Sequence, residues 1–212
     1  MKAVVIGSGG PLSQELLKAR CSEADLIVAA DGGGRYLYEI GLLPHMLVGD
    51  FDSIPQHMLE FFRSKGVRIS QYAREKDYTD LELAIAAAME EGADEITILG
   101  GMGSRFDHTA ANVFLLKCLL DKNIRACLED DHNRIFLTDR SIEITKQENW
   151  RVSLLSISPE VTHVSTSGLA YPLNDETLRF GSSRGVSNEF AGDTACICFK
   201  KGLLMVILSC GD

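Results

Sequence analysis

Several patterns that assign proteins to familiar classes are absent from this sequence. It has no Cys-X-X-Cys pair among its 6 cysteines, no GxxxxGK[ST] phosphate loop, and no apolar run of membrane-spanning length. Cys196 and Cys198 lie two positions apart in an apolar run, which favours buried free thiols over a zinc site or a disulfide framework. The N-terminus enters an apolar run at once, without the layout of a signal peptide. We therefore expect a cytoplasmic protein with reduced thiols.

Basic residues are also in the minority. The chain has 21 Lys and Arg against 30 Asp and Glu, a formal net charge of −9 at pH 7. Nucleic acids and anionic membranes call for a basic surface, so we expect neither as a partner. Small phosphate-bearing ligands remain possible, because loop amides, a few cations or a metal can hold them locally. The 212 residues, 45% hydrophobic, can bury a core in one large domain or two small ones.

Up to about residue 130, the chain repeats an apolar run, a Gly- or Asp-rich turn and a helical stretch. We expect strands at 3–6, 26–30, 46–48, 67–70, 95–99 and 124–128, and helices at 12–19, 35–40, 55–64, 81–91 and 109–120. Buried strands alternating with helices indicate an α/β fold, a mostly parallel, Rossmann-like sheet with helices on both faces. Ligands of such sheets bind beyond the carboxyl ends of the strands. The Gly and Asp clusters follow four of these strands, so we expect their loops to converge on one crevice.

The first of these turns, Gly7-Ser8-Gly9-Gly10, is not a complete dinucleotide fingerprint. Leu12 occupies the place of the third glycine. A nicotinamide site is therefore weakly supported, and a plain strand-to-helix turn is the better interpretation.

The third strand ends in two carboxylates, Asp50 and Asp52. In an extended backbone these side chains point the same way, while Phe51 points to the other side and can anchor the turn in the core. Two adjacent carboxylates repel each other unless a cation lies between them, and a hard divalent ion suits oxygen ligands. The alternative is a solvated, Asp-rich turn.

Asp31 follows the second strand and precedes Gly32 and Gly33. Glycines let a ligand approach the backbone closely while the carboxylate is fixed at the strand end. The alternative is a turn in which Asp31 caps a helix.

Asp77 and Asp80 precede the clearest helix of the chain, in which Thr79 and Glu82 form a capping-box pattern. Acidic residues in a first turn complement the helix dipole, which is sufficient reason for their presence. The same spacing also suits a third and a fourth carboxylate near the crevice. The sequence leaves both interpretations open.

A second glycine-rich segment, residues 101–108, precedes the fifth helix. Gly101 and Gly103 there favour an anion site at the helix N-terminus, and Arg105 can add a bidentate phosphate contact. Asp107 and His108 could orient groups or carry protons.

After Arg140 the pattern changes to short strands without long helices. We expect strands at 151–157, 163–166, 177–180, 195–199 and 203–209, hence a small antiparallel sandwich or barrel. The polar stretch 137–147 would form the boundary between a first domain, 1–137, and a second, 138–212. Tyr171, Ser187 and Asn188 lie beside glycines, which by themselves indicate ordinary β-turns.

In their order and spacing, these segments resemble the thiamine pyrophosphokinase family. The resemblance rests on Ala30-Asp31-Gly32-Gly33, Gly49-Asp50-Phe51-Asp52-Ser53, Lys76-Asp77-Tyr78-Thr79-Asp80, residues 101–108 and Ser187-Asn188-Glu189. It covers nearly the whole chain, including the change to an all-β second half. It implies Mg²⁺-dependent transfer of the pyrophosphoryl group of ATP to the thiamine hydroxyl, giving thiamine diphosphate and AMP, by a homodimer that binds thiamine where its subunits meet.

The resemblance also implies roles for individual residues. The implied metal ligands are Asp50, Asp52 and Asp80, with Asp77 close by. On the nucleotide side it implies Asp31, Gly32, Gly33, Lys76, Gly101, Gly103 and Arg105, with Asp107 and His108. Tyr171, Ser187 and Asn188 would form the thiamine pocket, and Asp31 or Asp77 would help take the hydroxyl proton.

Three other functions are compatible with the same metal loops. One is a pyrophosphokinase for another alcohol, such as a hydroxymethylpterin. Another is a non-catalytic sensor of nucleotide or thiamine, which would have no need of a complete carboxylate set. The last is a Mg²⁺-dependent hydrolase, whose phosphate release would not depend on an acceptor alcohol.

Overall fold

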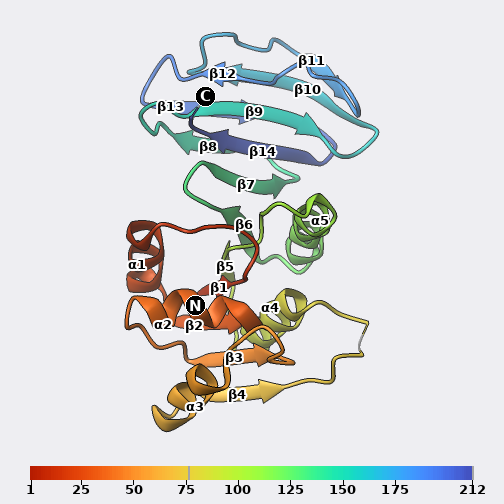
Figure 1. The fold of residues 1–212 in the computed structure, drawn as a ribbon. Coiled ribbons are helices and arrows are strands. Elements are labelled where there is room, and N and C mark those ends of the chain that lie inside the picture. Colours follow the sequence, from red (N-terminus) through yellow and green to blue (C-terminus); the bar gives the residue numbers. More distant parts are fainter. Residues whose placement is uncertain (76, 212) are drawn as a thin grey trace. The chain divides into compact units, whose positions relative to one another are not determined.

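The structure, a computed structural model, describes residues 1–75 and 77–211 (Figure 1). The chain divides into two compact units, Met1–Asp131 and His132–Asp212. The second unit thus begins ahead of residue 138, where the sequence placed the boundary. Among the described residues, no helix is long and apolar enough to cross a bilayer.

The first unit is built on a parallel sheet, as the alternating pattern predicted. Its strands are β1 (Lys2–Ile6), β2 (Leu26–Ala30), β3 (Met46–Gly49), β4 (Arg68–Gln71), β5 (Glu95–Leu99) and β6 (Arg125–Glu129). They lie in the order β6-β5-β1-β2-β3-β4, and each neighbouring pair is parallel. The strand order reverses at β1 and β5, and such a reversal opens a crevice at the carboxyl ends of the two strands.

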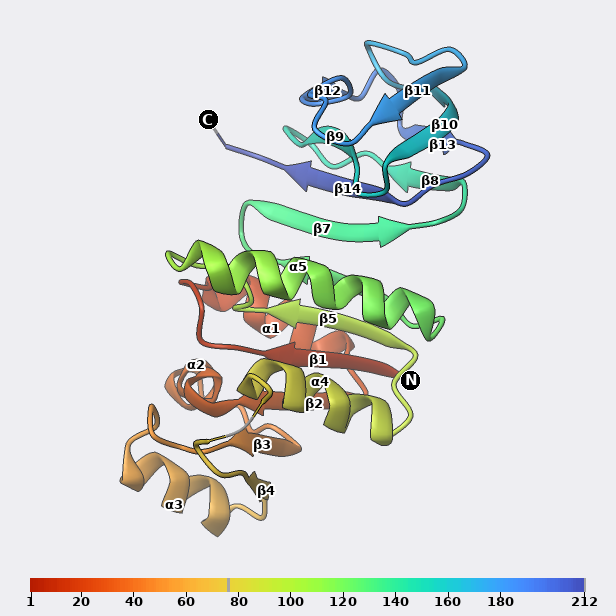
Figure 2. The same cartoon turned by 90° about the vertical axis from the view of Figure 1, so that its right-hand side faces the viewer.

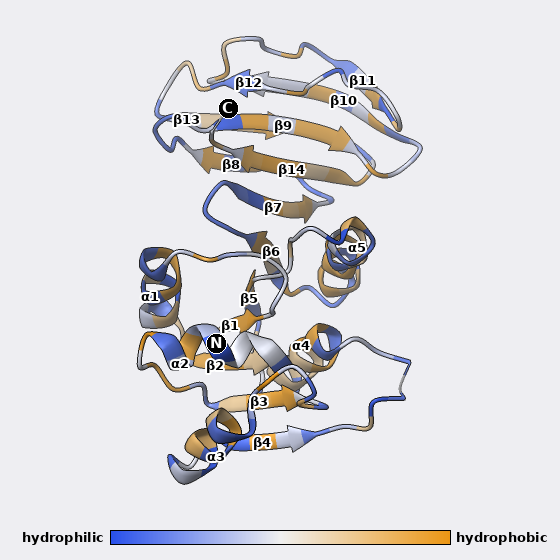
Figure 3. Ribbon diagram, viewed as in Figure 1, coloured by the Kyte–Doolittle hydropathy of each residue, from blue (hydrophilic) through white to orange (hydrophobic). Residues whose placement is uncertain are grey.

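Helices cover both faces of this sheet. They are α1 (Gln14–Glu23), the short 3₁₀ helix η1 (Asp31–Gly33), α2 (Gly34–Glu39), α3 (Gln56–Ser64), α4 (Asp80–Glu90) and α5 (Phe106–Asp121). Figures 1 and 2 show α1 and α2 on one face and α4 and α5 on the other. Apolar strands fill the space between them (Figure 3), and Ile6, Leu37, Leu47 and Phe62 are fully buried. This burial is the main force that holds the unit together.

Two helix starts bear on the crevice. Thr79 caps α4, and its hydroxyl accepts a hydrogen bond from the Glu82 amide at 3.2 Å, which confirms the capping pattern and places Asp80 in the first turn. Helix α5 begins at Phe106, before the expected start at residue 109, so Asp107 and His108 belong to its first turn and not to a loop.

The second unit is an antiparallel sandwich. Its strands are β7 (Asn133–Thr138), β8 (Ile142–Thr145), β9 (Arg151–Ser156), β10 (Glu160–Ser167), β11 (Glu176–Arg179), β12 (Asn188–Glu189), β13 (Thr194–Cys198) and β14 (Leu204–Ser209). They form the layers β12-β9-β14-β7 and β11-β10-β13-β8. Val152 and Val206 of one layer pack in a common core with Val164 and Ile197 of the other. This confirms the expected all-β second half.

The polar stretch 137–147, where the sequence placed the boundary, holds the end of β7 and all of β8, whose Ile144 is buried in the sandwich. One expectation for this unit was wrong. Cys196 and Cys198 are free but not buried, since β13 points Ala195 and Ile197 inward and the alternate residues outward. At both places the alternation of side chains along the strand decides burial, and the polar or apolar character of the whole segment does not.

The turn between β2 and α2 depends on a glycine. A Cβ atom at Gly33 would lie 2.0 Å from the carbonyl oxygen of Ile6 at the end of β1. No side chain fits there unless one of the two backbones moves. Gly192 is the opposite case, because the nearest atom to a Cβ there would be 3.7 Å away.

We expect Gly33→Ala to destabilise the protein by about 3 kcal/mol or more, since overpacking against rigid backbone is costly. The control Gly192→Ala should stay within about 0.5 kcal/mol of the parent. Urea unfolding of both variants measures the difference. Equal free energies of unfolding for the two variants would contradict the close approach of Gly33 to the end of β1.

Candidate active site

A cavity of about 590 Å³ lies at the carboxyl end of the parallel sheet, within the size range of small-molecule sites. It is lined by residues that follow β1, β2, β3 and β5 together with the starts of α4 and α5. They are Gly7, Ser8, Gly9, Ala30, Asp31, Asp50, Asp52, Ser53, Thr79, Asp80, Leu81, Gly100, Gly101, Gly103, Ser104, Arg105, His108, Thr109 and Asn112. Loops far apart in the sequence therefore converge here, as the sheet topology predicted.

Three carboxylates gather on one side of this cavity. Asp31, Asp50 and Asp52 each have an oxygen within 4.8 Å of an oxygen of the other two. This is the tightest acidic group found among the described residues, and it contains Asp31 in the place where the sequence suggested Asp80. Asp80 lines the same cavity from the first turn of α4.

The turn after β3 brings Asp50 and Asp52 together in a way that the sequence did not predict. Phe51 has a left-handed backbone with φ of 66°, so the turn is not extended. Its side chain is nevertheless buried, as expected. The Asp52 amide donates to Asp50 Oδ1 at 3.1 Å, and the Ser53 hydroxyl donates to Asp52 Oδ1 at 2.9 Å. These bonds fix the carboxylates of a tight Asx-type turn.

Asp31 is the buried member of the group, with 6% of its surface exposed. It also has a positive φ of 41°, at the start of η1. Its Oδ1 has no hydrogen-bond partner. Burial raises the pKa of its carboxyl, polar contacts with Ser53 and the Gly32 backbone oppose this, and the nearby charges of Asp80 and Asp50 raise the pKa further. A buried oxygen without a partner is costly unless a cation or a donor occupies the site.

The remaining acidic residue, Asp77, is exposed and does not line the cavity. Lys76, expected beside the nucleotide, lies outside the described residues. Arg74, which no sequence motif singled out, lies with its Nε 3.6 Å from Asp52 Oδ2. Because Arg74 is mostly exposed, this ion pair contributes little to stability.

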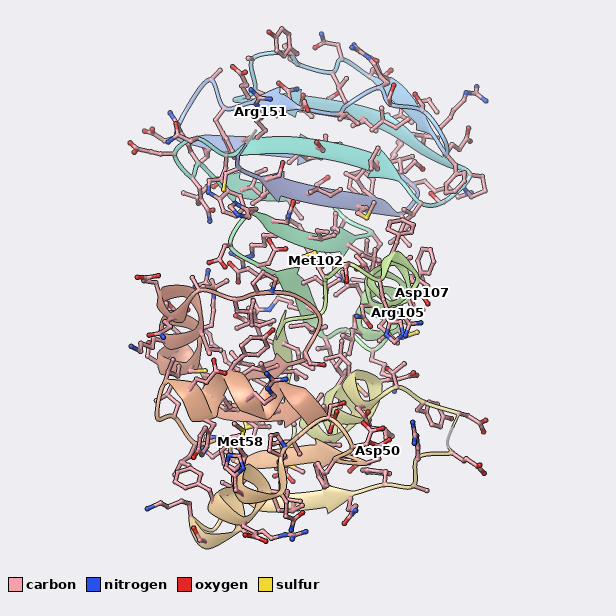
Figure 4. All side chains as sticks on the ribbon, viewed as in Figure 1. Asp50, Met58, Met102, Arg105, Asp107 and Arg151 are labelled. Carbon is pink, nitrogen blue, oxygen red and sulfur yellow. The ribbon has the colours of Figure 1, made fainter. Side chains whose placement is uncertain are left out.

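Opposite the carboxylates, the start of α5 brings cationic and glycine-rich elements to the cavity. Figure 4 shows Arg105 and Asp107 together at this helix start and Asp50 at the end of β3. Arg105 Nη2 lies 2.6 Å from Asp107 Oδ2, which lowers the pKa of that carboxyl. Arg105 and His108 line the cavity, whereas Asp107 holds Arg105 without lining it.

Two glycine turns form the floor between these sides. The Gly9 amide donates to the Gly100 carbonyl at 2.7 Å, and a Cβ at Gly103 would lie 2.0 Å from the Gly9 carbonyl oxygen. Gly7, Ser8 and Gly9 line the cavity, which confirms the expectation that the turn after the first strand joins the crevice.

Gly32 and Gly33, expected on the nucleotide side, are not among the residues that line the cavity. A Cβ at Gly32 would lie 3.1 Å from the Ser8 Cβ, whereas Gly33 packs against the end of β1. Two polar lining residues, Thr109 and Asn112, lie outside every motif that the sequence analysis named. Their polar side chains give no distinctive motif.

The candidate thiamine residues all lie in the second unit. Tyr171 is 66% exposed and Asn188 is buried. Asn188 Oδ1 accepts from the Tyr171 and Glu189 amides, both at 3.0 Å, and its Nδ2 donates to the Tyr171 carbonyl at 2.7 Å. Asn188 thus fixes the backbone that carries Tyr171. Ser187 lines a second cavity of about 590 Å³, together with Trp150 and residues near the end of β14.

The fold and the first cavity define a class of protein. A parallel α/β sheet with paired glycine turns, an arginine and clustered carboxylates at its carboxyl end is typical of enzymes that bind phosphate esters with a divalent cation.

Comparison with known proteins narrows this class to one family. Residues 17–128 match the model "Thiamin pyrophosphokinase, catalytic domain", and residues 140–204 match "Thiamin pyrophosphokinase, vitamin B1 binding domain". The chain is similar to the thiamine pyrophosphokinase of Bacillus subtilis, with 34% identity over 99% of each chain. This chain belongs to the thiamine pyrophosphokinase family, which confirms the resemblance seen in the sequence.

Two solved structures of this family have the same fold as this chain over its whole length. The crystal structure of the Bacillus subtilis thiamine pyrophosphokinase superposes with a TM-score of 0.89 at 31% identity, covering 100% of both chains. The thiamin pyrophosphokinase of Geobacillus thermodenitrificans gives 0.86 at 29% identity, covering 100% of this chain and 99% of that one.

The burial of Asp31 leads to a prediction about stability. We expect Asp31→Asn to raise the melting temperature of the metal-free protein at pH 7 by about 2–4 °C, because the substitution removes a buried charge from an acidic group. Calorimetry with and without Mg²⁺ measures this. The control Asp77→Asn, at an exposed acid outside the group, should leave the melting temperature unchanged. A lower melting temperature for Asp31→Asn would contradict repulsion within the group.

Proposed function

We propose that this chain transfers the pyrophosphoryl group of ATP to the hydroxyl of thiamine, giving thiamine diphosphate and AMP. The observation that carries the proposal is a single cavity that holds three carboxylates on one side and glycine turns with Arg105 on the other. Transfer of this kind depends mainly on positioning and on neutralising the phosphate charge, and these residue types supply both.

The carboxylate group fits Mg²⁺. Its ligands would be oxygens only, which a hard divalent cation prefers, and the buried Asp31 Oδ1 lacks a partner that a cation would provide. We assign the metal to Asp50 and Asp52, with Asp31 and Asp80 as the further carboxylates around it. When bound, the ion would neutralise charge on the phosphate oxygens.

Other residues of the chain would bind the phosphates and accept the proton of the thiamine hydroxyl. Arg105, held by Asp107, binds a phosphate oxygen, and the backbone around Gly101 and Gly103 lets the phosphates approach closely. We propose His108 as a further contact on this side and Lys76 as a nucleotide contact. Asp31 and Asp77 are the two candidates for accepting the proton of the thiamine hydroxyl. Asp31 is the better one, because it lines the cavity and its burial raises the pKa of its carboxyl, whereas Asp77 does not line the cavity.

On the acceptor side, we assign thiamine to Tyr171 and Ser187, with the Asn188 side chain bonded to the Tyr171 backbone. The match of residues 140–204 to a vitamin B1 binding domain supports this assignment. An exposed tyrosine ring can stack on the cationic thiazolium. We further propose a cytoplasmic homodimer that binds thiamine where its subunits meet. The catalytic part is proposed as residues 1–137 and the thiamine-binding part as 138–212.

A coupled assay tests the function. Purified protein is incubated with ATP and Mg²⁺, with and without thiamine, and both AMP and thiamine diphosphate are followed. The proposal requires AMP to form in step with thiamine diphosphate, and only when thiamine is present. AMP formation with another alcohol but not with thiamine would overturn the assignment of thiamine as the acceptor. AMP or phosphate released without any acceptor would indicate a hydrolase.

Asp52→Asn tests the metal assignment. We expect kcat to fall about a hundredfold or more while the fold is kept, because one charged oxygen ligand is replaced by a neutral group. Asp77→Asn is the control, which should retain most activity. Circular dichroism and the coupled assay measure both variants. A fully active Asp52→Asn would defeat the assignment.

Tyr171→Ala tests the thiamine assignment. Loss of a stacking ring should raise the KM for thiamine about tenfold and leave the KM for ATP unchanged. Phe180→Ala is the matched control, since Phe180 is an exposed aromatic residue of the same unit, 69% exposed beside 66% for Tyr171. Equal KM values for thiamine in the two variants would exclude Tyr171 from the pocket.

A further inference from the structure

Two polar side chains of α5 face the glycine turn between β5 and α5. Thr109 and Asn112 are three residues apart on the helix, so they lie on the same face. Both line the first cavity, and Asn112 is buried. Helix α5 packs against β6, the strand next to β5 in the sheet.

Each side chain is bonded to the backbone of the turn. Asn112 Nδ2 donates to the Gly101 carbonyl at 2.6 Å. The Thr109 hydroxyl oxygen accepts from the Gly103 amide at 3.1 Å and lies 3.3 Å from the Arg105 carbonyl, to which it can donate. The helix thus holds the turn on either side of Met102.

The turn packs closely against its neighbours. A Cβ at Gly101 would lie 2.5 Å from a Leu128 methyl carbon, and one at Gly103 would lie 2.0 Å from the Gly9 carbonyl oxygen. The glycines let the backbone come this close, but glycine gives no resistance to rotation about its own bonds. Side-chain bonds from a rigid helix supply that resistance.

We propose that Thr109 and Asn112 are positioning residues that hold the 101–105 turn in the shape that accepts the nucleotide phosphates. This inference rests on the proposed function, which places those phosphates at the same turn. Neither residue is assigned a contact with the reacting atoms. Because a preformed site spends less binding free energy on ordering its loops, the loss of either bond should weaken nucleotide binding.

The test uses Thr109→Val, which keeps the shape and removes the hydroxyl, and Asn112→Leu, which removes the amide donor. Thr109→Ser keeps the hydroxyl and serves as the conservative variant. Thr138→Val is the control for stability, because the buried Thr138 makes comparable hydroxyl bonds to the Arg140 backbone in the other unit.

Calorimetry measures the Kd of α,β-methylene ATP with Mg²⁺, without thiamine, for every variant. We expect Kd and the KM for ATP to rise about tenfold in Thr109→Val and Asn112→Leu, with the KM for thiamine unchanged. Thr109→Ser and Thr138→Val should bind the nucleotide as the parent does. Hydrogen exchange should speed up in the peptide that covers residues 99–106 in Thr109→Val, and not in Thr109→Ser.

The outcomes separate the two proposals. If the parent binds the nucleotide and both Thr109→Val and Asn112→Leu bind it equally well, the inference is overturned and the proposed function stands. Equal rises in the KM for ATP and for thiamine would also overturn it, since they indicate general loosening. If the parent fails to bind the nucleotide at all, the proposed function and the inference both fail.

Discussion

Repulsion among Asp31, Asp50 and Asp52 is the constraint that the packing of the first unit has to offset. Three carboxylates within 4.8 Å, one of them buried, raise the free energy of the metal-free fold. The apolar strands beneath them must offset that cost, as the fully buried Ile6 and Leu47 indicate. A stable core therefore supports a site whose clustered charges a bound cation would neutralise, the usual trade between stability and function.

Close packing of the backbone serves the same site. The turns after β1, β2 and β5 approach each other so closely that side chains are excluded at Gly33 and Gly103. Such packing leaves the amides and carbonyls of one turn as hydrogen-bond partners for another, as between Gly9 and Gly100. Glycine backbone thus forms part of the cavity wall, and the side chains that follow β2 and β3 or begin α4 and α5 give the cavity its charge.

Among the residues that the structure describes, the second unit differs from the first in having no cluster of charged residues in its core. Its sandwich core is apolar and needs no charged group, and its polar residues of interest lie at strand ends and turns. Asn188 shows how such a turn is fixed, since one buried amide satisfies three backbone groups and leaves the Tyr171 ring exposed. A connection fixed in this way presents an aromatic ring to solvent without a buried contact of its own.

Local patterns in the sequence were enough to predict the strands of the parallel sheet, the antiparallel second half and the convergence of the Gly and Asp loops, because hydrophobic period and element order are read along the chain. They did not predict that Asp31 is buried, that the backbone of Phe51 is left-handed, that Thr109 and Asn112 line the cavity, or that the Asn188 side chain bonds the backbone of its neighbours. Each of these depends on atoms brought together from distant parts of the chain, such as Gly9 beside Gly103. Only the tertiary structure decides such contacts, because no pattern of neighbouring residues specifies which distant segment of backbone will pack against a given turn.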